Sequence, residues 1–279
     1  MRPLDHLVMP TADLGVSRDR LVGLGFSVAP QGNHPFGTIN ACVYFADGTF
    51  IEPLAIGSAD SVDAAIADRN SFVRHDRQFR LASGEEGISG LVLGTDDAID
   101  DNAEFHRRSI SGGQIVEFSR SAVDAYGRMD TASFRLAFAG TPSAHPLHFF
   151  TCERRNAPKI DMQQLQQHEN GAAGISSVRI VAVRAEEIAH FLAEIARSRV
   201  TSRSGHYDVP LANSALTVRP AKTAVNARIE AVHFRVTDLT RLKDMLSSRG
   251  IGYQANSEGA ALVPAAPGQG ADFIFEELS

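Results

Sequence analysis

Cysteine is scarce in this chain: Cys42 and Cys152 are the two among 279 residues, and they form no Cys-x-x-Cys pair. This excludes a disulfide framework and a thiolate zinc site, and it suits a reducing cytoplasm. Basic residues are also few, with 27 Lys and Arg against 33 Asp and Glu, and they form no stripe. A dedicated nucleic-acid surface is therefore not expected. We expect a small-molecule substrate as partner, with a homodimer left open.

Long apolar runs are absent as well. No stretch approaches the about 18 apolar residues of a membrane span, and the opening residues lack the apolar segment of a signal peptide. We therefore expect a cytoplasmic protein without membrane contact. The local motifs of P-loop NTPases, zinc proteases and serine hydrolases are missing too, and "GLGFSV" does not match the dinucleotide-binding pattern. Any chemistry must come from residues that are distant in the sequence.

An internal repeat is the strongest positive feature of the sequence. Four segments with one pattern begin with short apolar strands, "LDHLVMPT", "ISGLVLGT", "ISSVRIVA" and "IEAVHFRV", at residues 4, 88, 175 and 229. Each opening strand precedes an amphipathic helix and then several short strand-like runs. We expect Thr11 or Asp13 to cap the first helix and Thr237 or Asp238 the fourth. The other two helices are expected near 97–108 and 186–197.

Each segment thus reads as a βαβββ module. A single module cannot bury both faces of its small sheet, so the modules must pair. We predict an α+β protein of four modules in two domains, residues 1–156 and 157–279. Residues 57–86 and 154–173 are interpreted as connectors.

This pattern resembles a known family. The paired modules, together with "LDHLV", "HPFGTIN", "HFFTCERR" and "HENGA", are similar to the vicinal oxygen chelate superfamily, specifically its glyoxalase-like branch. That superfamily also includes extradiol dioxygenases and bleomycin-resistance proteins. The resemblance implies that two modules form a cup that holds a divalent metal on ligands from the first and last strands of each module.

Aligning the modules gives three candidate ligands in the first domain. His6 lies in the first opening strand, and alignment of the closing strands places Glu52 opposite His148. Gly90, aligned with His6, cannot bind a metal. Two histidines and one carboxylate could hold iron, manganese, zinc or nickel and leave positions open for substrate oxygens.

The second domain does not offer such a set. Glu276 lies in its last strand, but Ser177 and Ala231 stand at the opening positions. His233 keeps the inward parity of its strand and is interpreted as a hydrogen-bonded core residue. We therefore expect this domain to lack a complete metal site.

Further residues could act around the cup. His34 and Asn40 in "HPFGTIN" could be acid/base or substrate groups, or polar side chains of an exposed turn. Arg154 could bind a substrate carboxylate or simply be solvated. His168 could contact substrate or serve a turn. Buried Glu52 needs a partner, which could be the metal or an arginine such as Arg135.

Two functions from different classes follow. The first is a metal-dependent lyase, isomerase or dioxygenase acting on a small oxygenated molecule, with His34 or Glu52 as the base. The second is a metal-free protein that binds or sequesters a small molecule in the cup, where inward phenylalanines would supply the contacts. The sequence leaves open whether the chain is an enzyme.

Overall fold

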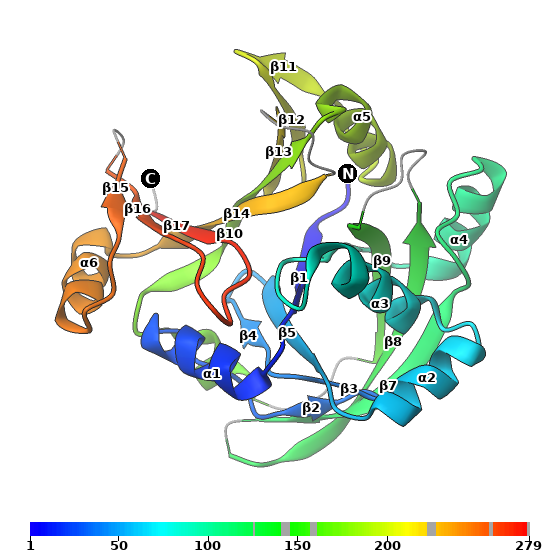
Figure 1. The fold of residues 1–279 in the computed structure, drawn as a ribbon, viewed down its shortest axis with the longest axis horizontal. Coiled ribbons are helices and arrows are strands. Elements are labelled where there is room, and N and C mark those ends of the chain that lie inside the picture. Colours follow the sequence, from blue (N-terminus) through cyan, green and yellow to red (C-terminus); the bar gives the residue numbers. More distant parts are fainter. Residues whose placement is uncertain (125, 141–145, 157–160, 222–226, 257–258, 278–279) are drawn as a thin grey trace.

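The computed structural model describes residues 1–124, 126–140, 146–156, 161–221, 227–256 and 259–277 (Figure 1). The helices are α1 Leu14–Gly23, α2 Ala59–Ala67, α3 Ser71–Ser83, α4 Ala98–Arg107, α5 Ala185–Ile195 and α6 Leu239–Ser248, with a 3-10 turn η1 Gln163–Gln166. Strands of the first half are β1 Leu4–Pro10, β2 Gly32–Asn33, β3 Thr38–Asn40, β4 Val43–Tyr44, β5 Phe50–Ile56, β6 Gly90–Gly94, β7 Val116–Val123, β8 Met129–Ala139 and β9 His148–Asn156. Those of the second half are β10 Ala172–Ala182, β11 Thr201–Arg203, β12 His206–Pro210, β13 Ala215–Pro220, β14 Arg228–Val236, β15 Gln254–Ala255, β16 Ala261–Val263 and β17 Asp272–Glu277.

The strands form two sheets of similar design. The first has the order β2-β3-β5-β1-β6-β9-β8-β7, with β4 also on β5, and the second has the order β11-β12-β13-β10-β14-β17-β16-β15. In each sheet the opening strands of two modules pair antiparallel at the centre, and each opening strand pairs in parallel with the last strand of its own module. The predicted α+β fold of four paired βαβββ modules is therefore confirmed. The expected domain boundary after residue 156 adjoins residues 157–160, which lie outside the described part of the chain.

Local signals fix where the repeat helices begin. The side chain of Asp13 accepts hydrogen bonds from the backbone N–H groups of Gly15 and Val16, and that of Asp238 accepts one from Arg241 N–H. These two aspartates are the N-caps, which satisfy donors that have no partner inside a helix. The structure thus decides between the alternatives that the sequence offered.

Residues 57–86 were expected only as a connector, and that expectation is wrong: they contain the two helices α2 and α3. Ser58 and Asn70 cap them, and Val62, Phe72 and Val73 face inward. These apolar side chains join Val8, Val92 and Phe150 in one buried cluster on the inner face of the first sheet. An insertion with an apolar face is buried wherever unpaired apolar surface is available, and here the cup supplies that surface.

The two sheets share one core. A single cluster of buried apolar residues includes Leu7 and Met9 of β1 together with Val178 of β10 and Phe234 of β14. In Figure 1 the N-terminus lies between the two halves of the molecule, near α5. The backbone N–H of Arg2 donates to the carbonyl of Ala196, which ties the first strand of the chain to the second half.

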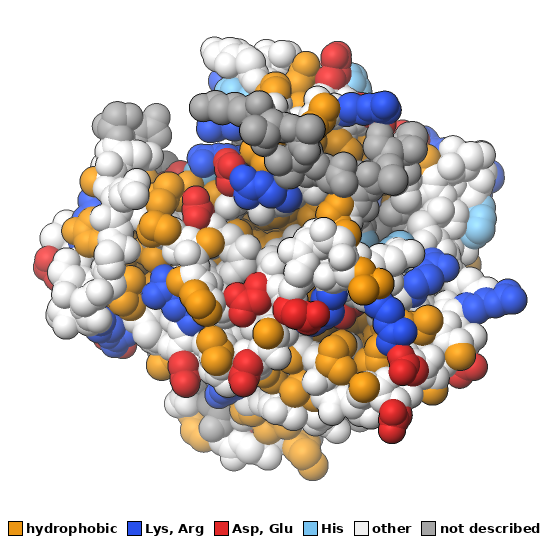
Figure 2. Space-filling model, in the orientation of Figure 1, with side chains coloured by type: hydrophobic (Ala, Val, Ile, Leu, Met, Phe, Trp, Pro, Cys, Tyr) orange, Lys and Arg blue, Asp and Glu red, His pale blue; other side chains and the backbone are white. Residues whose placement is uncertain are grey.

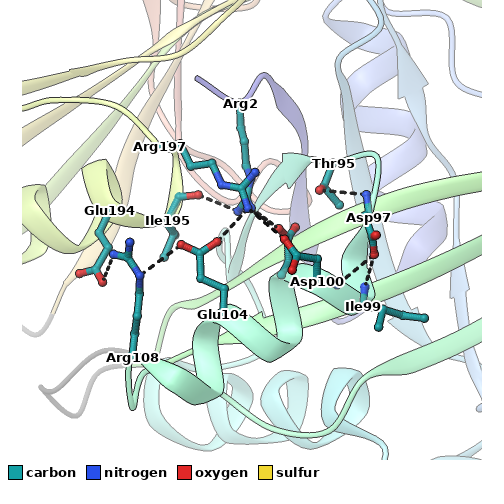
Figure 3. Close-up of polar contacts among 11 residues, drawn as sticks. Arg2, Thr95, Asp97, Ile99, Asp100, Glu104, Arg108, Glu194, Ile195 and Arg197 are labelled. Atoms are coloured by element: carbon teal, nitrogen blue, oxygen red, sulfur yellow. Dashed lines mark hydrogen bonds and ion pairs between the residues drawn. The ribbon is translucent and has the colours of Figure 1, made fainter.

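A buried ionic network strengthens this junction (Figure 3). The Arg2 guanidinium bonds to Asp101 on α4 and donates 2.8 Å to the carbonyl of Ile195, while Arg197 reaches Asp101 at 3.2 Å and Glu104 at 2.8 Å. The network therefore links a helix of the second module to the end of the helix of the third.

The surface carries charges of both signs. On the face shown in Figure 2, acidic and basic side chains alternate without a continuous basic patch. Within the described residues, no helix combines the length and apolar character that crossing a membrane requires.

Candidate functional site

The first sheet brings His6 and Glu52 together. In the register of β1 and β5, His6 lies opposite Phe50, so Glu52 stands two residues further along on the same face. His6 Nε2 is 3.7 Å from Glu52 Oε2, and both side chains are buried. Two of the three expected ligands are therefore neighbours.

Asn40 and His34 complete the surroundings of this carboxylate. The Asn40 side-chain amide donates 2.6 Å to Glu52 Oε1, and His34 Nε2 lies 3.6 Å from the same oxygen. Both residues are buried, so they are not the solvated turn residues of the alternative interpretation. Arg135, the other partner considered for Glu52, pairs instead with Glu117 and Glu153.

His34 is held as a neutral imidazole. Burial, with smaller contributions from Arg120 and His6, lowers the pKa of His34 to about 3. Its Nδ1 lies 2.9 Å from the hydroxyl of Thr38. If that hydroxyl donates to Nδ1, the single N–H of the neutral ring is on Nε2 and faces Glu52.

A chain of polar contacts connects His6 to the surface. His6 Nδ1 is 2.6 Å from Asp5 Oδ1, and Asp5 Oδ2 is 2.9 Å from a guanidinium nitrogen of half-exposed Arg154. The His6 ring stacks on Phe50 with centroids 4.3 Å apart. His6 therefore stands between two carboxylates, with its ring plane fixed by an aromatic neighbour.

A pocket of about 220 Å³ lies next to this group. Asn40, which bonds Glu52, and Phe50, which stacks on His6, both line it. The lining also includes Arg120 and Phe134 of the β7–β8 hairpin, and Arg154. Glu52 and His6 are not among the residues that line the pocket, and Asn40 and Phe50 stand between them and its interior.

His148 is in a different part of the cup. One row across the sheet consists, in order, of Glu52, Val8, Gly90 and His148. Strands are about 4.8 Å apart, so the backbones of Glu52 and His148 are separated by about 14 Å along the sheet. Glu52 and His148 thus lie at the two ends of one row across the sheet. Across the β1–β6 pair Val8 lies opposite Gly90 and His6 lies opposite Val92, and a bulge separates Leu4 from His6.

Helix α3 packs on the His148 half of the cup. The His148 ring is stacked with His75 of α3 at 5.6 Å and with Phe150 at 5.8 Å. A Cβ built on Gly90 would lie 2.8 Å from His148 Nε2 and 2.9 Å from a Val8 methyl, so the glycine leaves the room that the imidazole occupies. Sequence reasoning missed this helix, although its Phe72, Val73 and Phe79 spacing is a readable signal.

The expected metal ligands were tested against this arrangement. Across the described ranges, no three His, Cys, Asp or Glu side chains are arranged to hold a metal ion. His6 and Glu52 supply two donors, but Glu52 Oε1 already accepts from Asn40, and His148 packs under α3. The expected set of His6, Glu52 and His148 is thus not assembled, and the residues present do not fit a three-ligand metal site.

His168 is tied to the backbone of the first module. Its Nδ1 accepts from the N–H of Ser27 at 3.0 Å, and its Nε2 donates to the carbonyl of Tyr44 at 2.9 Å. Both ring nitrogens are occupied, and burial lowers the pKa of His168 to about 4. Its contacts join the segment before β10 to the first module.

The second sheet repeats the His–Glu pair without the rest of the site. His233 Nδ1 is 2.6 Å from Glu276 Oε1, and Arg179 lies 3.0 Å from His233 Nε2. His233 lies opposite Ile274, and Glu276 is two residues further along, which is the register relation of His6 and Glu52. His233 is hydrogen-bonded, as its interpretation as a core residue required.

The sequence analysis did not identify Asp5, Tyr44 or Arg120. Asp5 adjoins His6, so the dipeptide could have suggested it. Arg120 lies in a strand of the other module, 68 residues after Glu52. No local pattern relates such residues, since their proximity depends on how the hairpin closes over the sheet.

Comparisons with solved structures agree with the fold. A hypothetical protein from Staphylococcus aureus aligns over the whole of both chains with a TM-score of 0.72 and 14% identity. A mutant 4-hydroxymandelate synthase from Streptomyces coelicolor has a TM-score of 0.61 and 10% identity, over 99% of this chain and 92% of that one. A Mn(II)-bound glyoxalase from Novosphingobium aromaticivorans has a TM-score of 0.56 and 9% identity, over 99% and 83%.

A family model agrees with the resemblance noted in the sequence. No curated protein matched the sequence. The model of the glyoxalase-like domain matches residues 4–196, which is more than half of the chain and includes the whole His6–Glu52 group. The two-sheet architecture and this match lead to one conclusion: the chain belongs to the glyoxalase-like domain family.

Proposed function

We propose that the chain is a glyoxalase-like enzyme of the lyase or isomerase type, which moves a proton on a small oxygenated molecule with Glu52 as the base. The observation that carries the proposal is the placement of Glu52. It is 5% exposed, it is hydrogen-bonded by Asn40 of the pocket wall, and it has an imidazole nitrogen 3.7 Å from one oxygen and 3.6 Å from the other. A carboxylate held in one orientation beside a bound molecule can act as a general base.

The chemistry can be written with the residues present. Glu52 removes a proton from a carbon next to a carbonyl group; the C–H electron pair forms a C=C bond, and the carbonyl electrons move to its oxygen. Neutral His34 and the Asn40 amide keep the carboxylate oriented. His6 and Asp5 offer a route by which the proton on Glu52 could leave toward Arg154 and solvent.

No step of this proposal passes through a metal. A divalent metal on His6, Glu52 and His148 was the expectation from the sequence, and a solved neighbour is a Mn(II)-bound glyoxalase. In this chain α3 and the strand register keep His148 apart from the other two residues. The proposal therefore rests on proton transfer alone.

The test is hydrogen–deuterium exchange into small carbonyl compounds, with pyruvate and phenylpyruvate as probes in D2O followed by NMR. The wild type should accelerate exchange above the buffer rate, and Glu52→Gln should lose at least about 100-fold of that acceleration. Glu276→Gln, which alters the matching His–Glu pair of the second sheet, is the control and should keep it. Equal rates for the wild type and Glu52→Gln, or equal losses in both variants, would contradict the proposal.

The second candidate function is metal-free binding of a small molecule. It is favoured by the aromatic walls of the pocket, where Phe45, Phe50 and Phe134 provide apolar surface. Saturable binding of a probe with no exchange above buffer would support this function over the first.

A further inference from the structure

Arg120 differs from the other arginines on its side of the cup. Among the described residues, Arg135, Arg154 and Arg155 each form an ion pair with a carboxylate, whereas Arg120 forms none. Its Nε is buried without a hydrogen-bond partner, and its guanidinium lies over the ring of Phe134 at 5.6 Å. The guanidinium contacts the Tyr44 side chain and the carbonyl of Ser121, but these are neutral groups. An arginine that lines a pocket without an ion pair can bind an anion there.

The neighbours of Arg120 do not neutralise it. Burial raises the pKa of the Cys42 thiol to about 12 and also raises the pKa of the Tyr44 phenol, so both side chains are neutral at pH 7. Glu52 is the acidic residue of the group and its charge acts on Arg120, but the two side chains do not form an ion pair, and Glu52 Oε1 accepts from Asn40. A cation thus remains in a partly desolvated wall, and a ligand can supply the missing negative charge.

The volume and the lining of the pocket restrict the size and shape of the remainder of the ligand. A volume of about 220 Å³ is below the roughly 300–1,000 Å³ of drug-sized sites, so a single ring or a short chain fits better than a nucleotide or a glutathione adduct. Phe50 and Phe134 line it as flat surfaces, and Asn40 marks the end next to Glu52.

We infer that the ligand of this cup is a small carboxylate with a flat apolar body, whose carboxylate binds Arg120 while its body lies against Phe50 and Phe134. This inference rests on the proposed function, because it names the substrate class of the same site. It orients the molecule as well: the anionic end faces the β7–β8 hairpin, and the carbon that loses its proton lies toward Asn40 and Glu52.

The test compares benzoate with benzamide, which has nearly the same shape but no charge. Calorimetric titration should show that benzoate binds the wild type at least about 10-fold more tightly than benzamide, since a charge-assisted bidentate pair is lost with the amide. Arg120→Gln should reduce benzoate affinity by at least about 10-fold, and Arg120→Lys should retain part of it because the charge remains without the fork. Arg155→Gln, an exposed and paired arginine of the same sheet, should bind benzoate like the wild type.

The outcomes separate this inference from the proposed proton transfer. Benzoate has no proton next to a carbonyl, so its binding does not require a base, and Glu52→Gln should still bind it. Loss of benzoate binding in Arg120→Gln without any exchange activity in the wild type would sustain the anion site and refute the proton transfer. Equal affinities for benzoate and benzamide, or unchanged benzoate binding in both Arg120 variants, would overturn the inference; circular dichroism checks that each variant is folded.

Discussion

Asp101 gives the sharpest test of how the two halves are joined. Its side chain is 1% exposed and bonds to Arg2, which is 6% exposed, and to Arg197. Replacing Asp101 by Ala leaves the Arg2 guanidinium buried without its carboxylate, a change that costs about 3–5 kcal/mol of the free energy of unfolding. Total stabilities are about 5–15 kcal/mol, so the loss is a large fraction of the whole.

The matched control is an exposed pair. Asp63 and Arg77 also form an ion pair, but their side chains are 63% and 43% exposed. Asp63→Ala should therefore cost less than about 1 kcal/mol. Urea denaturation followed by circular dichroism measures both, and with an m value of about 3 kcal/mol per molar the Asp101→Ala midpoint should fall by about 1 M or more.

The comparison refutes the reasoning if the two variants lose the same stability. In that case burial of the network would add nothing to the pair, and the junction would depend on the shared apolar core alone. A loss confined to Asp101→Ala would establish that the ionic network of Figure 3 holds the halves together.

Three further predictions follow from single positions. The pKa of His168 is about 4 in the folded state against 6.5 in the unfolded state, so the free energy of unfolding should fall by up to about 3 kcal/mol as pH falls from 6.5 toward 4. In urea titrations at several pH values, His168→Gln should reduce this dependence of stability on pH. An unchanged pH dependence would refute the role of His168. Gly90→Ala should lower the free energy of unfolding by about 1–3 kcal/mol, because the added Cβ meets the His148 ring. Adding His148→Ala should restore part of that stability, whereas purely additive losses in the double variant would contradict the contact. Asp13→Ala should lower the free energy of unfolding by about 1 kcal/mol, and Asp13→Asn by less, because asparagine can still cap the helix. Equal stability of Asp13→Ala and the wild type would contradict the cap.

Much of the fold could be read from the sequence because its signals are local. The period of Leu14, Leu21 and Leu24, the capping aspartate before them and the glycine at 25 all act within a few residues of one another. The same pattern recurs four times, and a lone module cannot bury its sheet, so pairing followed from elementary burial arguments.

Part of the candidate site could be predicted for the same reason. His6 and Glu52 lie on paired strands of one module, two residues apart in register, and both were named from the sequence. The sequence also singled out His34 and Asn40 beside the cup. Their contacts with Glu52 follow from the short turn between β2 and β3.

What only the tertiary structure decided is what occupies the cup. The sequence of α3 encodes an amphipathic helix, but the surface that receives its apolar face is set by the free area of the first sheet. This packing covers His148, whereas Phe50 and Asn40, the contact partners of His6 and Glu52, line the pocket. The placement of Arg120 depends on the closure of a hairpin from the second module over the first. The sequence by itself determined the repeated elements, whose interactions are short in range, whereas long-range packing and strand register determined which polar residues meet.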